Sequence, residues 1–250
     1  MKIGIMQPYF FPYLGYFQLI HAVDRFLLYP HVQHIRDGWV DRNRILIKWG
    51  KPIFIHVPVQ TCSQDTPIRD VLIDHQDGAW RKRILRLLHY NYAACKFYPE
   101  VRPLIEELLD PKIPDLCSLN CRLIVKIASA IGLRTEIVCA GKEYLEIEQS
   151  LAPDAEQGGL PSGADKKSTR IQRLCQEEGA DTYINAIGGV DLYSKPLFET
   201  WGIELLFLSP GERPYPQFSA EFHPRLSIID VLMHNGFAAT GKLAQEYALI

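Results

Sequence analysis

A turn rich in aromatic residues and proline follows the first apolar run of the chain, at residues 7–16 (QPYFFPYLGY). Gln7 supplies an oriented amide, and Tyr9, Tyr13 and Tyr16 supply rings and hydroxyl groups. This combination is typical of a site for a flat or sugar-like ligand. We predict that Gln7, Tyr9 and Tyr16 bind substrate and that Tyr13 takes part in catalysis. The alternative is a loop that only covers the fold.

A second group of chemically capable residues consists of Trp39, Arg42, Asn43 and Arg44. If this stretch is extended, residues two apart share a face, so both guanidinium groups point the same way. Two guanidinium groups on one face can hold a carboxylate or a phosphate bidentately. We predict that these four residues bind substrate and that the arginines share one pocket with the aromatic turn. A solvated strand edge is an equal alternative.

Basic and hydroxyl residues open a helical segment at Lys167 and Thr169. Because the first turn of a helix attracts anions, these residues are candidates for phosphate binding. Asn185 and Gly188 end a later apolar run, where glycine lets a ligand approach the backbone. We predict that all four bind substrate. Helix capping by Ser168 or Thr169 would explain the hydroxyl groups without a ligand.

Two of the eight histidines, His31 and His34, follow the second apolar run and are candidate catalytic bases, because imidazole titrates near neutral pH. The histidines lack the spacing and acidic companions of a metal site. Cys117 and Cys121 lie four residues apart, without the second pair that would complete a zinc set. We therefore predict no metal site and reduced, mostly buried cysteines, and no sequence motif identifies a nucleophile.

These residues must be positioned by an α/β fold, because short apolar runs alternate with segments of helical period. In open parallel sheets, ligands bind at the carboxyl ends of the strands, where the aromatic turn falls. We predict strands at 2–6, 25–29, 134–140, 182–186 and 203–208, and helices at 16–23, 168–178, 197–201 and 227–234, the last ended by Asn235-Gly236.

Two segments interrupt this alternation, and we predict a single domain over residues 1–250 that includes both. Residues 40–75 form a small antiparallel insertion, with a hairpin of strands 43–48 and 52–59 and a further strand at 68–73. Residues 77–131 form a helical segment, with helices after residue 77, at 99–109 and at 116–131. Residues 149–165, rich in glycine, proline, alanine and serine, are predicted to be a mobile loop.

The composition is that of a soluble globular chain, with 47% hydrophobic and 22% charged residues among 250. It excludes disordered, collagen-like and coiled-coil classes. The formal net charge of −2 argues against a nucleic-acid partner or an anionic membrane surface. No apolar run reaches the roughly 20 residues of a membrane span, and the first residues do not form a signal peptide. We expect a cytoplasmic protein with a small-molecule substrate and no membrane insertion.

Residues 1–16 resemble the start of the nucleotidylyltransferase superfamily, in which a strand and a proline-containing loop lead to a His-x-Gly-His motif. Tyr13-Leu14-Gly15-Tyr16 stands at that position. Tyrosine donates a hydrogen bond to phosphate but carries no positive charge near neutral pH. This resemblance therefore supports a Rossmann-like, nucleotidylyltransferase-like sheet more than it supports nucleotidyl transfer.

Over nearly its whole length the sequence resembles the WbqC-like family, through IMQPYFFPYLGYFQLI, VQHIRDGWVDRNRI, the Lys-Ser-Thr-Arg helix start, YINAIGG and LSIIDVLMHNG. The chain departs from the family pattern at two places: Pro30-His31 stands where acidic residues are usual, and Asp41 where asparagine is usual. The positions that match the family motifs are Gln7, Pro8, Pro12, Gly15, Tyr16, Trp39, Arg42, Asn43, Arg44, Lys167, Asp230, Asn235 and Gly236.

This resemblance implies a transferase in the synthesis of bacterial O-antigen, lipopolysaccharide or another surface polysaccharide. Such an enzyme would modify a nucleotide-activated sugar with an acyl or amino-acid group. A non-catalytic nucleotide- or sugar-binding scaffold is the alternative, because no nucleophile is evident, and a nucleotidylyltransferase is the second alternative. The cofactor stays open, with a nucleotide, a nucleotide-sugar and Mg²⁺ as candidates, and so does the oligomeric state.

Overall fold

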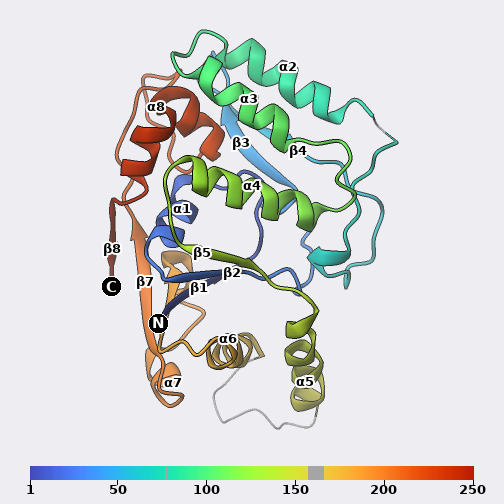
Figure 1. Cartoon of the computed structure of the whole chain (residues 1–250), viewed down its shortest axis with the longest axis vertical. Helices are drawn as coiled ribbons and strands as arrows, with labels where there is room; N and C mark the ends of the chain where they lie inside the picture. The colour runs from blue at the N-terminus through green and yellow to red at the C-terminus, as the bar shows by residue number, and fades with distance from the viewer. Residues whose placement is uncertain (77, 157–165) are drawn as a thin grey trace.

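A six-stranded sheet organises the chain, which the computed structural model describes over residues 1–76, 78–156 and 166–250 (Figure 1). The strand order is β5-β2-β1-β6-β7-β8. All neighbours pair in parallel except β7 and β8, which pair antiparallel. The predicted α/β fold with a mostly parallel sheet is confirmed. The strand bounds are β1 (Lys2–Met6), β2 (Arg25–Leu28), β5 (Glu136–Cys139), β6 (Thr182–Ala186), β7 (Glu204–Pro210) and β8 (Tyr247–Leu249).

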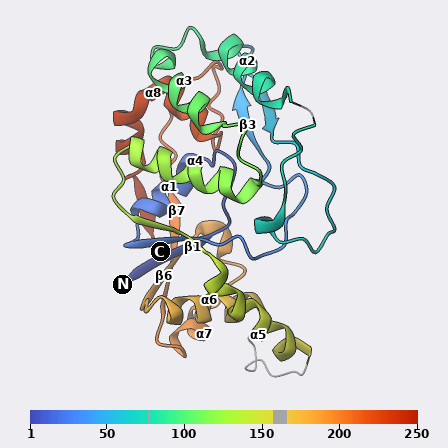
Figure 2. The same ribbon diagram turned by 45° about the vertical axis from the view of Figure 1, so that its right-hand side comes forward.

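Helices cover both faces of the sheet (Figures 1 and 2). One face carries α1 (Leu14–His21), α4 (Leu116–Ala130) and α8 (Ile228–Leu243), and the other carries α5 (Leu145–Glu156), α6 (Lys166–Glu177) and α7 (Lys195–Glu199). Each face has its own apolar core because side chains alternate along a strand. On β2, Phe26 and Leu28 enter the first core and Leu27 enters the second.

The chain winds in opposite directions from the middle of the sheet. From β1 it passes to β2 and β5 on one side, and from β6 it passes to β7 on the other. The reversal lies between β1 and β6, and sheets of this kind bind ligands outside the carboxyl ends of the strands at such a point.

An antiparallel hairpin, β3 (Arg42–Leu46) and β4 (Pro52–His56), stands apart from the main sheet, beside α2 (Trp80–Tyr92) and α3 (Tyr98–Leu108). The predicted hairpin and helical segment are confirmed. The further strand predicted at residues 68–73 is wrong: η1 (Ile68–Asp70) is a turn of 3-10 helix, and Ile73 makes an isolated bridge with Val59. The Ile68 N–H donates to the Val32 carbonyl of a loop, 3.0 Å away, so no strand ladder forms there.

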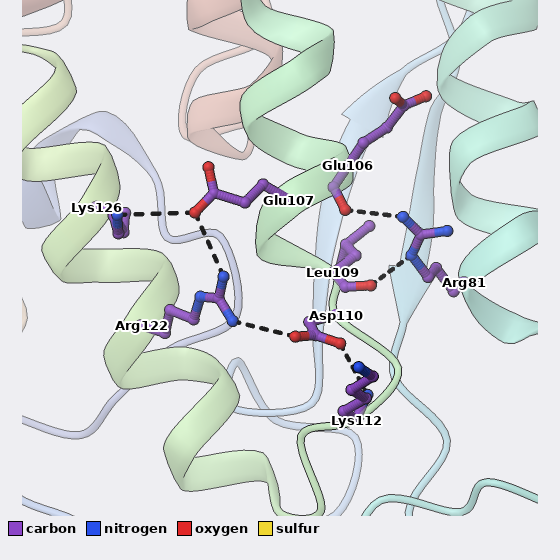
Figure 3. A network of polar contacts seen from close by, with 8 residues as sticks. All are labelled: Arg81, Glu106, Glu107, Leu109, Asp110, Lys112, Arg122 and Lys126. Carbon is purple, nitrogen blue, oxygen red and sulfur yellow. Dashed lines mark hydrogen bonds and ion pairs between the residues drawn. The ribbon is translucent and has the colours of Figure 1, made fainter.

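Charged side chains tie the three helices of the helical segment together (Figure 3). Arg81 of α2 donates to the carbonyls of Glu106 (2.8 Å) and Leu109 (2.5 Å), at the carboxyl end of α3. These carbonyls lack helical partners, so the guanidinium acts as a cap for α3. On the other side of α3, Arg122 of α4 lies 3.4 Å from Asp110 and 3.3 Å from Glu107, which Lys126 also approaches at 3.7 Å.

The structure corrects two further expectations. Residues 149–156 of the predicted mobile loop belong to α5, whereas residues 157–165 lie outside the described residues. Ser168 and Thr169 do not cap α6, because the helix already begins at Lys166 and both residues are buried inside it.

The break predicted at Asn235-Gly236 is present inside α8, where two helical stretches meet, and the prediction lacks only the second stretch, which continues to Leu243. Gly236 does leave the helical conformation, with φ 71° and ψ 178°. A side chain there would meet the Phe97 ring at 2.6 Å, so glycine is required for this close approach. The helix resumes after the kink, and Thr240 donates from Oγ1 to the Gly236 carbonyl.

Candidate functional site

The reversal point between β1 and β6 brings together residues that follow two different strands. The ladder that joins β1 to β6 consists of Lys2–Thr182 and Ile3–Tyr183, whereas four pairs join β1 to β2 and five join β6 to β7. The β1–β6 ladder therefore stops well before the carboxyl ends, where Gln7 and Asn185 lie. The predicted placement of these two residues at one edge of the sheet agrees with this topology.

Other predicted ligand contacts lie on the same side of the sheet. Asn185 is buried, and its Oδ1 accepts from the Ala186 N–H at 2.8 Å. No atom lies within 4 Å of where a Cβ at Gly188 would be. The space beside this backbone is therefore free for a ligand. Helix α6 leads back from β5 to the parallel strand β6, so it runs antiparallel to both strands. Its first residues therefore lie near the carboxyl ends of the strands, and Lys167 is exposed there. Thr169 is buried.

His31 joins the carboxyl ends of β2 and β5. Its Nε2 lies 2.7 Å from the Gly141 carbonyl and its Nδ1 lies 3.2 Å from Arg69 Nη1. A carbonyl only accepts, so Nε2 carries the proton and Nδ1 accepts from the guanidinium. Burial lowers the pKa of His31, which keeps the ring neutral. To act as a base, His31 must first release Arg69.

His34 faces a carboxylate, in the loop that connects β2 to β3. Its Nε2 lies 3.8 Å from Asp41 Oδ2, and both residues are buried. Burial lowers the pKa of His34 and raises the pKa of Asp41, so it works against charge on either group. Within the described part of the chain, His34 Nε2 and Asp41 Oδ1 have no hydrogen-bond partner.

The two arginines of the second motif do share a face of β3, as predicted. The guanidinium of Arg42 lies 4.3 Å from the Phe54 ring centre, and that of Arg44 lies 5.7 Å from the Trp39 ring centre. Asn43 points to the opposite face and donates from Nδ2 to the carbonyls of Phe10 (3.1 Å) and Phe11 (2.9 Å). The motif therefore meets the aromatic turn through Asn43, and the arginines point away from it.

The aromatic turn is held mainly through its backbone carbonyls. Besides Asn43, Asn120 of α4 donates to the Pro8 carbonyl (2.9 Å) and to the Val40 carbonyl (2.7 Å), and Ser227, just before α8, donates to the Phe11 carbonyl (2.9 Å). Tyr16 is buried and donates its hydroxyl to the Gln7 carbonyl at 2.8 Å. The Tyr9 ring, partly buried, packs 5.6 Å from the Tyr16 ring. Tyr16 therefore holds the turn in place.

A cleft opens at the end of this turn, between the start of α1 and the carboxyl end of β7. The cleft is shallow: its free space is about 370 Å³ when open solvent is included, but only about 30 Å³ of it can be occupied by the centre of a water-sized sphere. We call it the α1–β7 cleft. Tyr13 and Gly15 form one wall and Pro210 another. A side chain at Gly15 would lie 2.4 Å from the Tyr13 ring and 3.2 Å from Pro210, so glycine allows the tyrosine to lie over the helix start. Arg42 and Arg44 do not line this cleft, so they do not share it with Tyr13.

The rim of the α1–β7 cleft carries charge. Arg225 donates from Nε to Glu212 at 2.7 Å, and Arg213 donates from Nη1 to Glu246 at 2.7 Å. Burial raises the pKa of Tyr13, so this wall presents a neutral phenol that can donate a hydrogen bond. Sequence reasoning missed both arginines, because they lie in an irregular segment without periodicity.

Behind the cleft lies a buried carboxylate. Tyr215 lines the cleft and donates its hydroxyl to Asp230 Oδ1 at 2.8 Å, and Tyr92 donates to Asp230 Oδ2 at 2.7 Å. Burial raises the pKa of Asp230, and the two hydroxyl groups oppose that rise. His234, one turn later on α8, has a pKa lowered by burial. The sequence signal for this cluster is an acidic residue inside the apolar run 226–233.

A family model named the WbqC-like protein family matches residues 7–242, which include the aromatic turn, the hairpin arginines and Asp230. The chain belongs to the WbqC-like protein family. This WbqC-like protein is also similar to the uncharacterised protein Rv1507c of Mycobacterium tuberculosis, with 30% identity over 245 residues that cover 97% of each chain. No solved structure matches it.

Two general properties of this WbqC-like protein bear on the site. Over residues 1–76, 78–156 and 166–250, no three histidine, cysteine or acidic side chains are arranged to hold a metal ion. None of the helices in the same ranges is both long and apolar enough to cross a membrane.

Proposed function

We propose that this WbqC-like protein is a transferase of bacterial surface-polysaccharide synthesis that modifies a nucleotide-activated sugar. The α1–β7 cleft carries this proposal, because it combines aromatic walls with guanidinium groups at its rim. Aromatic rings bind the flat faces of bases and sugars, and guanidinium groups bind phosphate. The group transferred in the proposed reaction is an acyl or amino-acid group.

The diphosphate of such a substrate would lie near the first turn of α1. The start of a helix favours an anion, although one N–H of this turn, that of Tyr16, already donates to the Tyr13 carbonyl at 3.0 Å. Arg225 and Arg213 would exchange their partners Glu212 and Glu246 for phosphate oxygens. This exchange costs little, because exposed ion pairs contribute about 0–1 kcal/mol.

Tyr13 is the proposed catalytic residue, because it is the phenol at the helix start and burial keeps it neutral, so that it can donate a hydrogen bond to the reacting group. His31 and His34 are also held neutral, the state that a base needs, but neither lines the cleft. In this proposal the two histidines position the loop between β2 and β3. Gln7, Asn185, Gly188 and Lys167 would contact a part of the substrate that extends toward the β1–β6 edge.

A non-catalytic binding protein is the second candidate, and one observation favours it. Among the described residues that line the α1–β7 cleft, there is no serine, cysteine, histidine or lysine to act as a nucleophile. Apart from the Glu212 carboxylate and the tyrosine hydroxyl groups, the described lining offers no nucleophile, which favours direct transfer between two bound substrates. Nucleotidyl transfer is less well supported, because Tyr13 and Tyr16 supply no positive charge and the Tyr16 hydroxyl already donates to the Gln7 carbonyl.

Thermal shift with a panel of nucleoside diphosphate sugars tests the binding site. We expect one class of nucleotide-sugar to stabilise the protein, and the Arg225→Ala variant to lose that stabilisation. Arg134→Ala is the matched control, because Arg134 is exposed and lies outside the cleft. If no nucleotide-sugar changes the melting temperature, the proposal is wrong.

Tyr13→Phe separates the two candidate functions. The stabilising nucleotide-sugar would be incubated with acyl-thioesters, or with amino acids and ATP, and its mass followed. A transferase should lose product formation in this variant while binding stays near the wild-type level. Binding without any mass change in the wild-type protein would support the scaffold instead.

A further inference from the structure

Positive charge is distributed unevenly along this chain. Residues 42–64 and 78–99 together contain nine of the 27 lysines and arginines and none of the 29 aspartates and glutamates. The first segment contains the hairpin, and the second contains α2, which lies at the end of the molecule opposite α5, α6 and α7 (Figures 1 and 2). The formal net charge of −2 therefore describes the molecule as a whole but not this end of it.

One face of α2 is exposed and basic. Lys82, Arg86 and Tyr90 are exposed and follow one another at intervals of four residues, so they form one stripe along the helix. Ile84 and Leu88 are buried on the other side and belong to the core. Because α2 contains no acidic residue, its cations lack the partners four residues away that often neutralise charge on an exposed helix.

The turn between β3 and β4 continues this stripe. Trp49 in the turn is 72% exposed, and its ring centre lies 6.2 Å from that of Tyr90, which is 55% exposed. Lys48 Nζ lies 4.7 Å from the Tyr90 ring centre, and Lys51 is exposed two residues after Trp49. We call this set the α2–hairpin surface; it consists of Lys48, Trp49, Lys51, Lys82, Arg86 and Tyr90.

The exposed tryptophan is presented by a turn that is fixed on both sides. Gly50 has φ 71° and packs closely against Ser219, because a Cβ at residue 50 would lie 3.2 Å from the Ser219 side chain. The Lys48 N–H donates to Asn91 Oδ1 of α2 at 3.2 Å, so the turn and the helix are joined. Trp49 therefore projects from a supported turn.

We propose that the α2–hairpin surface docks this protein on an anionic lipid bilayer, at the level of the headgroups. Lysine and arginine side chains are attracted to anionic headgroups, and tryptophan and tyrosine rings favour the boundary between headgroups and acyl chains. The apolar face of α2 belongs to the core, so the helix lies on the bilayer and does not enter it. The contact depends neither on the α1–β7 cleft nor on the proposed transferase reaction.

The arrangement of the surface favours a bilayer over a single-stranded nucleic acid. Single strands follow basic grooves in which bases stack on aromatic rings. Here Lys48 lies over the Tyr90 ring, where a base would have to stack, and Trp49 projects outward. A projecting tryptophan beside lysines fits a flat anionic surface.

Vesicle flotation with the full chain tests this inference. We expect the protein to float with vesicles of equal parts phosphatidylglycerol and phosphatidylcholine, and not with vesicles of phosphatidylcholine alone. Added salt should release it, because the screening length falls from about 10 Å at 0.1 M to about 3 Å at 1 M. Equal binding to both kinds of vesicle overturns the proposal, and so does binding to polyuridylate RNA in place of the anionic vesicles.

A pair of double variants separates this surface from the overall charge. Lys82→Gln with Arg86→Gln should weaken binding to the anionic vesicles about 25-fold, because each lysine or arginine at such a surface contributes about fivefold. Arg134→Gln with Lys195→Gln is the matched control, since it removes the same charge from exposed positions outside the α2–hairpin surface. Equal weakening in both double variants would show that this surface is not the one that binds.

The fluorescence of Trp49 gives a second measurement. On binding to the anionic vesicles, tryptophan emission should shift to shorter wavelength as the ring leaves water. Trp49→Ala changes an exposed residue and should lose this shift together with several-fold in affinity. A shift that persists in Trp49→Ala would mean that another tryptophan meets the bilayer, and would overturn the proposed placement.

Discussion

The aromatic turn depends on side chains from other elements, and Asn43→Ala measures that dependence. The variant removes the donations from Nδ2 to the carbonyls of Phe10 and Phe11. Phe11 keeps its bond from Ser227 at 2.9 Å, so the Phe10 carbonyl is left without this side-chain donor, and the Arg44 N–H loses the Asn43 Oδ1 acceptor at 2.8 Å. An unsatisfied buried group costs about 1–3 kcal/mol and an ordinary lost hydrogen bond about 0.5–1.5 kcal/mol. We therefore expect unfolding free energy to fall by about 2–4 kcal/mol in urea denaturation.

The shared Phe11 carbonyl makes a sharper test possible. Ser227→Ala alone should cost about 1–2 kcal/mol, because Ser227 also caps α8. In the double variant the carbonyl loses both donors, so the loss should exceed the sum of the single losses by about 1 kcal/mol. Asn43→Ala combined with Thr135→Ala, whose hydroxyl donates to Ile20, is the additive control. Additivity within about 0.5 kcal/mol for the first pair would refute this account of the turn.

Three further predictions follow from single contacts. In Gly15→Ala the added methyl group displaces the Tyr13 ring. We expect binding of the stabilising nucleotide-sugar to weaken about tenfold in titration calorimetry, or about 1.4 kcal/mol, with little change in melting temperature. Unchanged affinity would contradict this. Burial lowers the pKa of His31 from its ordinary value of 6.5. Just below pH 6.5 the unfolded chain therefore binds more protons than the folded protein, and the unfolding free energy falls as the pH drops. In urea denaturation at several pH values, His31→Gln should reduce this dependence by at most about 1.4 kcal/mol per pH unit. Arg81→Ala should lower unfolding free energy by about 1–2 kcal/mol through the lost cap of α3, whereas the exposed control Arg86→Ala should change it by less than about 0.5 kcal/mol.

Much of the main sheet could be predicted, because local patterns determine it. The strand at 182–186 was predicted with its observed bounds, and the hairpin and the helices of the helical segment were found near their true positions. Strand β8 was missed because its three residues form a strand only by pairing with β7. The segment 68–73 was assigned wrongly, because its apolar residues are buried by a turn and isolated bridges rather than by a ladder.

The candidate site was less predictable than the fold. Tyr13 lies in a turn whose composition alone makes it a candidate site residue. Arg42 and Arg44 were correctly placed on one face, but alternation along a strand does not tell which face meets the turn. Arg213 and Arg225 reach the cleft from a segment without periodicity, so only the tertiary structure brings them there.

The hydrogen bonds to the carbonyls of the aromatic turn make its shape depend on three separate elements. Asn43, Asn120 and Ser227 come from the hairpin, from α4 and from the start of α8, which are distant in sequence. The turn that leads into the cleft therefore keeps its shape only while all three elements are docked. In the proposed function, a bound substrate would stabilise the docked arrangement of these elements.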